Sequence, residues 1–256
     1  MGWPHDPGAL VELQLELAAR ADAAQPWRPG NPAAVGGCFV AYATGQAGPG
    51  HPGDRAWAAA VAWLAPYAGA GGRARSGDLA LKGATAWPRR AADVAGQAVV
   101  EGTVPAAYAP GLLALREGEI LDAAVRALEP RPDVLLVDAT GLDHPRGAGL
   151  AVHLGAEVDL PTVGVTRRPL LAAGEEPPLV RGRTAPVVLG GRVVGHWVCT
   201  RTGARPVVAH AAWRTDPETA AETVVMASTE GAVTPVPLQE ARRVAREARS
   251  LGERAG

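Results

Sequence analysis

The sequence predicts an α/β domain whose strands and helices share one core. Three short apolar runs precede a helical segment, and a fourth apolar run, residues 132–137, has the length of a buried strand. Asp138 follows that run directly, at a turn that contains glycine. Ligands bind beside the carboxyl ends of strands in open α/β sheets. We therefore expect Asp138 to lie at a functional site, with a turn cap as the structural alternative.

The N-terminal region contains one predicted helix, a linker and three predicted strands. Residues 7–21 place Leu10, Leu13 and Leu17 at helical spacing, which favours an amphipathic helix, although apolar residues there also alternate as in a strand. Prolines and glycine in residues 26–32 predict a linker. The runs predicted as strands are 35–42, 57–64 and 97–102, with a glycine-rich inserted loop between the last two.

The C-terminal half contains further helices and a hairpin. Helical spacing predicts a helix over 112–128, ended by Pro130. Gly190 and Gly191 form the two-residue turn of a predicted hairpin over 187–198. Further helices are predicted at 216–226 and 238–251, the last being arginine-rich and either solvated or bound to a partner. The predicted units are an N-terminal helix and linker at 1–34, a main domain at 35–232 with a flexible insertion near 67–95, and a C-terminal helical tail at 233–256.

Composition narrows the class of protein. At 256 residues with 47% apolar residues, the chain can bury a full core despite its 32 glycines and 23 prolines. The net charge of −1 provides no global attraction to phosphate, so nucleic-acid binding would need a local basic face. The candidates for that face, which otherwise form a solvated rim, are Arg146, Arg167, Arg168, Arg181 and Arg183.

Neither the cysteines nor the apolar runs indicate another kind of site. Cys38 and Cys199 lie in separate apolar runs without metal-ligand spacing, which predicts buried thiols. No apolar run approaches the length of a membrane span, and the first residues lack the pattern of a secretory leader. We therefore expect a cytoplasmic protein without a membrane partner.

Three motifs follow one another along the chain. They are Tyr108-Ala109-Pro110-Gly111 with Arg116-Glu117, then Val-Asp-Ala-Thr-Gly-Leu-Asp-His-Pro-Arg-Gly at 137–147, then Asp-Leu-Pro-Thr-Val-Gly-Val-Thr-Arg at 159–167. Their order and spacing are similar to Tyr-x-Pro-Gly-x-x-x-x-Arg-Glu, Val-Asp-Gly-x-Gly-x-x-His-Pro-Arg and Asp-x-Pro-Thr-x-Gly-Val-x-Lys of the endonuclease V family. The chain resembles that family over roughly residues 35–225.

This resemblance implies a ribonuclease H-like mixed sheet flanked by helices. It also implies a DNA-repair hydrolase that cleaves nucleic acid near deaminated bases, typically inosine, with Mg²⁺ or Mn²⁺. Carried over by position, the metal-binding carboxylates are Glu117 and Asp138. The expected catalytic residues are Glu117, Asp138, His144, Arg167 and His210, and the expected substrate-binding residues are Tyr108, Pro110, Gly111, Phe39 and Arg146.

Two positions depart from the family pattern. Phe39, in Gly37-Cys38-Phe39-Val40-Ala41-Tyr42, stands where the family has the Asp of Gly-Ala-Asp-Val-Gly-Phe, and a phenyl ring cannot ligate Mg²⁺. Arg167 replaces the family's Lys, which keeps the charge but removes a group able to release a proton. If the alignment slips, Asp54 is the nearest downstream acidic residue, although it lies in a turn-rich segment. The resemblance thus predicts an incomplete metal site and an altered activity.

Structural alternatives accompany several of these assignments. Glu117 would otherwise be a solvated helix residue, Tyr108 a ring packed on the surface, and Asp159 either a site carboxylate or a cap. At the level of function, the alternative is a fold repurposed for small-molecule biosynthetic chemistry, as a homo-oligomer or as a subunit whose protein partner completes the site. An aromatic in the former metal position would suit an apolar substrate. A non-catalytic partner protein is the third option.

Overall fold

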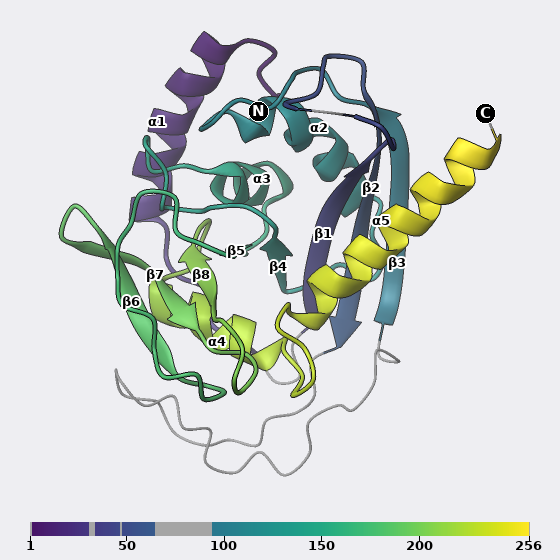
Figure 1. Ribbon diagram of the computed structural model, residues 1–256. Helices are drawn as coiled ribbons and strands as arrows, with labels where there is room; N and C mark the ends of the chain where they lie inside the picture. The colour runs from purple at the N-terminus through teal and green to yellow at the C-terminus, as the bar shows by residue number, and fades with distance from the viewer. Residues whose placement is uncertain (1, 31–33, 47, 65–93, 256) are drawn as a thin grey trace.

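The computed structural model describes residues 2–30, 34–46, 48–64 and 94–255. Its centre is an eight-stranded mixed sheet in the order β3-β2-β1-β4-β5-β8-β7-β6 (Figure 1). Neighbouring strands are parallel only at β1–β4 and β4–β5. The strands are β1 Ala34–Tyr42, β2 Arg55–Leu64, β3 Val94–Thr103, β4 Val134–Val137, β5 Thr162–Thr166, β6 Thr184–Leu189, β7 Arg192–Val198 and β8 Val207–Ala211.

Helices cover both faces of this sheet (Figure 1). One face packs against α1 (Pro7–Ala23), α2 (Leu113–Arg126) and α3 (Leu150–Val158). The opposite face packs against α4 (Pro217–Met226) and α5 (Val236–Ala255). The α/β architecture predicted from the alternating patterns is therefore confirmed. The central strands are buried from both sides, which explains their nearly continuous apolar sequences.

Most local predictions agree with these elements. The 7–21 segment is a helix rather than a strand, and Asp6 caps it by accepting a hydrogen bond from the Ala9 amide at 3.0 Å. The hairpin turns at Gly190-Gly191 as predicted, with positive φ at both glycines. Helix α3 escapes sequence analysis because nearly all of it is buried, so it lacks an amphipathic stripe. The predicted insertion near 67–95 falls almost entirely outside the described residues.

The C-terminal helix packs on the sheet and is not a solvated tail. Helix α5 buries Val236, Leu238, Ala241, Val244 and Ala245 against β1 and β2. Gly37 of β1 permits this close approach, because a Cβ there would lie 2.4 Å from the carbonyl carbon of Pro237. The arginine-rich sequence hid this contact, since only a few apolar residues of the helix face the strands. The domain boundaries proposed from the sequence stay a prediction.

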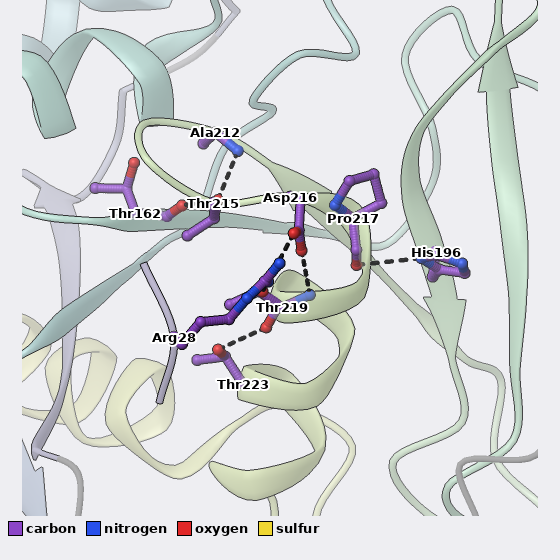
Figure 2. Close-up of polar contacts among 9 residues, drawn as sticks. All are labelled: Arg28, Thr162, His196, Ala212, Thr215, Asp216, Pro217, Thr219 and Thr223. Atoms are coloured by element: carbon purple, nitrogen blue, oxygen red, sulfur yellow. Dashed lines mark hydrogen bonds and ion pairs between the residues drawn. The ribbon is translucent and has the colours of Figure 1, made fainter. Parts of the chain in front are cut away.

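The predicted linker also packs on the domain where it is described. Arg28 forms an ion pair with Asp216 at 2.6 Å, at the N-terminus of α4, as Figure 2 shows. Asp216 also accepts the Thr219 amide at 2.7 Å and thereby caps α4. The Trp27 amide donates to the Arg214 carbonyl at 2.7 Å. The segment between α1 and β1 is thus held against α4 over its described residues.

Candidate functional site

The carboxyl end of β4 brings together three of the predicted site residues. Strands β1 and β4 are parallel, and Cys38 is in register with Val137. The residues that follow these two in sequence are Phe39 and Asp138. Together with Glu117 of α2 they line one cavity of about 70 Å³. The register thus places Phe39 beside Asp138, where the resemblance predicts a second carboxylate.

Glu117 reaches this cavity from α2 and has one hydroxyl partner. The Tyr42 hydroxyl donates a hydrogen bond to Glu117 Oε1 at 2.8 Å. Burial raises the pKa of Glu117 to about 7, and the negative charge of Asp138 acts in the same direction, whereas the Tyr42 hydrogen bond opposes the rise. Glu117 is therefore not a residue of a solvated helix face. Near neutral pH it holds a proton for part of the time.

Asp138 is paired with an arginine from the opposite face of the sheet. Arg242 of α5 donates from Nη2 to Asp138 Oδ2 at 2.7 Å. The same guanidinium lies over the Phe39 ring, 5.3 Å from its centroid. An aromatic ring and a cation thus occupy the surroundings of Asp138.

Asp54 does not replace the missing carboxylate. It accepts hydrogen bonds from the His51 amide at 2.7 Å and from Arg116 Nη2 at 2.9 Å. Arg116 is buried and stacks over Tyr42 at 4.3 Å, so Asp54 supports the Tyr42–Glu117 contact from behind. Asp54 does not line the cavity at Asp138, and its side chain is paired with Arg116, so the structure does not bring it into the candidate site.

A second group of predicted residues surrounds the turn at Tyr108–Gly111. Three side chains converge on the Gly111 carbonyl: Gln14 Nε2 at 3.1 Å, His144 Nε2 at 3.2 Å and Arg146 Nη2 at 2.7 Å. Gly111 has a φ of +73°, which favours glycine. Tyr108 is 48% exposed. The turn therefore presents an exposed ring on a tightly held backbone.

His144 has a defined tautomer in this arrangement. Its Nδ1 accepts the Arg146 amide at 3.3 Å, so Nε2 carries the proton that is donated to the Gly111 carbonyl. Burial lowers the pKa of His144 to about 4, and the Gly111 hydrogen bond opposes this shift. A neutral imidazole that is already bonded on both nitrogens positions the turn. The structure does not place His144 among the residues that line the Asp138 cavity.

His210 lies in the core rather than in that cavity. Its Nδ1 is 3.7 Å from Asp143 Oδ2, and both side chains are fully buried. Thr166 donates its hydroxyl proton to the Arg168 carbonyl at 2.7 Å, so the hydroxyl oxygen accepts from His210 Nε2 at 2.7 Å. Asp143 also accepts the amides of Leu170, Leu171 and Ala172. His210 thus belongs to a buried network that holds the chain after β5.

The remaining candidates lie at the two ends of β5. Arg167 follows the carboxyl end of β5, is exposed and donates to Thr234 Oγ1 at 3.1 Å. Asp159 precedes β5 as the left-handed C-cap of α3, with φ +50°, and pairs with Arg214 at 3.5 Å. Because β4 and β5 are parallel, Asp159 lies at the sheet edge opposite Asp138 and is not a site carboxylate.

Sequence reasoning missed Gln14, Tyr42 and Arg242. Gln14 left a signal, because it is a polar residue within the apolar stripe of α1 and is almost fully buried. Tyr42 was visible only as an apolar strand residue. Arg242 left no such signal, because 104 positions separate it from Asp138 and four other arginines lie nearby in sequence.

The described ranges contain neither a metal cluster nor a membrane-spanning helix. Among the residues with defined positions, no group of three or more histidine, cysteine, aspartate or glutamate side chains could hold a metal ion. In the same part of the chain, no helix combines the length and apolar character needed to cross a bilayer.

The parallel centre of the mixed sheet, the helices on both faces and the acidic strand mouth define a ribonuclease H-like α/β protein. Residues 74–243 match the family model described as Endonuclease V. The chain therefore belongs to the endonuclease V family.

Individual relatives agree with this assignment. Endonuclease V of Methanopyrus kandleri is 49% identical over 117 residues, which are 45% of this chain and 50% of the relative. That of Streptomyces coelicolor is 42% identical over 114 residues, 44% of this chain and 49% of the relative. The chain thus spans about half the length of the curated relatives it matches.

Solved structures extend the likeness over the whole chain. The crystal structure of Endonuclease V from Streptomyces avermitilis has a TM-score of 0.77 and 30% identity, covering 100% of this chain and 97% of that one. A Ciona intestinalis Endonuclease V, crystallised with a 24mer DNA containing an inosine followed by a ribo-adenosine, has a TM-score of 0.66 and 17% identity. That structure covers 94% of this chain and 96% of the Ciona chain, and its likeness concerns the fold alone.

Proposed function

We propose that this protein binds a nucleic-acid strand carrying a deaminated base and cleaves it more slowly than relatives with a complete carboxylate set. Family membership and the inosine-containing DNA bound to the Ciona protein support the choice of substrate. The observation that carries the altered activity is the pair Phe39 and Arg242 beside Asp138. No observation favours a protein partner.

The residues present do not fit the metal ion on which the family generally depends. Mg²⁺ requires oxygen ligands in near-octahedral geometry. Here Phe39 contributes no oxygen, and Asp138 is paired with Arg242. We therefore derive no reaction step through a metal ion. Slow cleavage is expected because the groups that would stabilise the attacking and leaving oxygens are incomplete.

Base recognition is the part of the activity that the described residues support. Tyr108 is exposed beside the Pro110-Gly111 turn, and Gln14, His144 and Arg146 hold that turn in place. An exposed aromatic ring next to a backbone held in this way can stack on a base, and such stacking contributes about 1–3 kcal/mol per base. Tyr108 is thus proposed as the base-contacting residue, with His144 and Arg146 as positioning residues.

The small-molecule alternative gains no support from the cavity at Asp138. Its volume of about 70 Å³ is well below the roughly 300 Å³ at which pockets begin to enclose a small-molecule ligand. A strand that lies across the sheet edge does not need an enclosed pocket. The shape of the site therefore favours nucleic acid over a small apolar substrate.

Fluorescence anisotropy with a labelled single strand tests the binding half of the proposal. The natural protein should bind a strand with one inosine more tightly than the same strand with adenosine. Tyr108→Ala should weaken inosine binding about 5- to 150-fold, as expected for the loss of one stacked base. Leu179→Ala, which truncates an equally exposed apolar residue elsewhere, should have no effect. Equal affinity for the two strands would refute base recognition.

Cleavage of the inosine strand with Mg²⁺ or Mn²⁺ tests the other half. The natural protein should cleave more slowly than the Streptomyces avermitilis relative assayed beside it. Phe39→Asp should accelerate cleavage. Phe39→Asn should not, because asparagine has the size of aspartate without its negative charge. Equal rates for the natural protein and the relative would contradict the proposed slow activity.

A further inference from the structure

Helix α5 carries arginines along an open groove that begins beside Asp138. The groove has a volume of about 720 Å³ and is lined by residues of α5 alone, among them Arg242, Arg243, Arg246 and Arg254. Helix α5 lies diagonally across the β1–β3 side of the sheet (Figure 1). Four arginines against one glutamate in this lining, next to a nucleic-acid site, suggest an anionic ligand.

The arginines of this groove are not equally available to bind an anion. Arg243 lies between Glu240 and Glu247, at 2.8 Å from each carboxylate, so its charge is satisfied within the helix. Arg242 has one carboxylate partner, Asp138. Arg246 is exposed and has no carboxylate within ion-pair distance in the described ranges, and its guanidinium lies 5.9 Å from the centroid of the Phe39 ring. Arg246 thus contributes an unbalanced positive charge.

Arg242 and Arg246 also share a single aromatic support. Both guanidiniums lie over Phe39, at 5.3 and 5.9 Å from the ring centroid, and the two residues are one helical turn apart. Like charges at this spacing destabilise a helix by about 0.2–0.5 kcal/mol. Asp138 balances only one of the two charges, and both arginine side chains are at least partly exposed. The arrangement can therefore accept one more anionic group.

We propose that Arg242 and Arg246, supported by Phe39, bind one backbone phosphate of the nucleic-acid strand. Guanidinium groups suit this ligand because their fork matches two phosphate oxygens at once. An aspartate at position 39 would pair with these arginines and consume their charge. The change to phenylalanine thus converts an acidic, cation-binding position into a cationic, phosphate-binding one.

This proposal rests on the proposed function, because the phosphate belongs to the strand that Tyr108 would read. The experiment measures the affinity of the full chain for a labelled single strand over a series of salt concentrations. Arg246→Gln should weaken binding about tenfold, as for one charge-assisted hydrogen bond. It should also reduce the slope of log K against log salt by about 0.7, the value for one phosphate contact on a single strand.

The matched control is Arg192→Gln, which removes the same charge from the β6–β7 hairpin, outside the groove, and should change neither quantity. Arg242→Gln should act like Arg246→Gln, with thermal unfolding as a check because it also breaks the Asp138 pair. Arg246 is exposed, so its variant is expected to fold normally. Phe39→Asp should weaken strand binding even if it accelerates cleavage, whereas Phe39→Leu should retain most of the affinity.

The possible outcomes separate the two proposals. If Arg246→Gln and Arg192→Gln behave alike while the inosine preference persists, the phosphate site is wrong and the proposed function stands. If strand binding depends on Arg246 but shows no inosine preference, the phosphate site stands and base recognition fails. If the natural protein binds neither strand, both proposals are overturned.

Discussion

His144 provides the most quantitative prediction, because its buried imidazole is held neutral. Burial lowers its pKa from the ordinary value of 6.5 to about 4. Between these two values the unfolded chain takes up a proton that the folded protein does not, so stability is present above pH 6.5 and is lost as pH falls toward 4. The complete loss would be about 3 kcal/mol, at 1.36 kcal/mol per pKa unit.

The measurable part of this effect lies between pH 7 and pH 5. Over that interval the linkage relation gives a loss of about 2 kcal/mol in the free energy of unfolding from His144 alone. Urea denaturation at the two pH values measures the loss in the natural protein and in His144→Gln. Glutamine retains a donor for the Gly111 carbonyl but does not titrate.

The difference between the two proteins isolates His144 from other buried histidines. Burial also lowers the pKa values of His153 and His210, so the natural protein should lose more than 2 kcal/mol in total. His144→Gln should lose about 2 kcal/mol less than the natural protein. The control His51→Gln, which removes an exposed imidazole, should lose as much as the natural protein. Equal losses in His144→Gln and the natural protein would show that the imidazole is not held neutral.

Three further changes test the packing and the buried polar contacts. Gly37→Ala should destabilise the protein by about 3 kcal/mol because the new methyl group meets the Pro237 backbone; an unchanged melting temperature would contradict the close approach of α5. Gly111→Ala should cost about 1–2 kcal/mol in urea denaturation because of its positive φ, and inosine binding should weaken with it; a neutral result in both assays would refute the held turn. Asp143→Ala should cost at least about 3 kcal/mol because it leaves the amides of 170–172 without an acceptor; hydrogen exchange at those amides should accelerate, and unchanged protection would count against the network.

Local patterns in the sequence were sufficient for the architecture and for part of the site. Apolar runs of strand length, a two-glycine turn and helical spacing define the elements, because each depends on residues that are near neighbours in the chain. The strand ending at Asp138 and the motif around Glu117 likewise identify carboxylates that the structure brings to one cavity. Helix α3 and the strands β5 and β8 were not predicted; for α3 the reason is that nearly the whole helix is buried, which removes the periodicity that reveals a helix.

Contacts between distant segments were decided only by the tertiary structure. Arg242 meets Asp138 across 104 positions, and Gln14 meets Gly111 across 97. The side chains of His144 and Arg146 belong to the Tyr108 turn, and that of His210 to a buried network with Asp143. The sequence by itself determined which residue types are available and where strands and helices form, since these follow from local hydrophobicity and backbone preference. Which charges meet, and whether a carboxylate faces a cavity or an arginine, depends on how the helices pack on the two faces of the sheet.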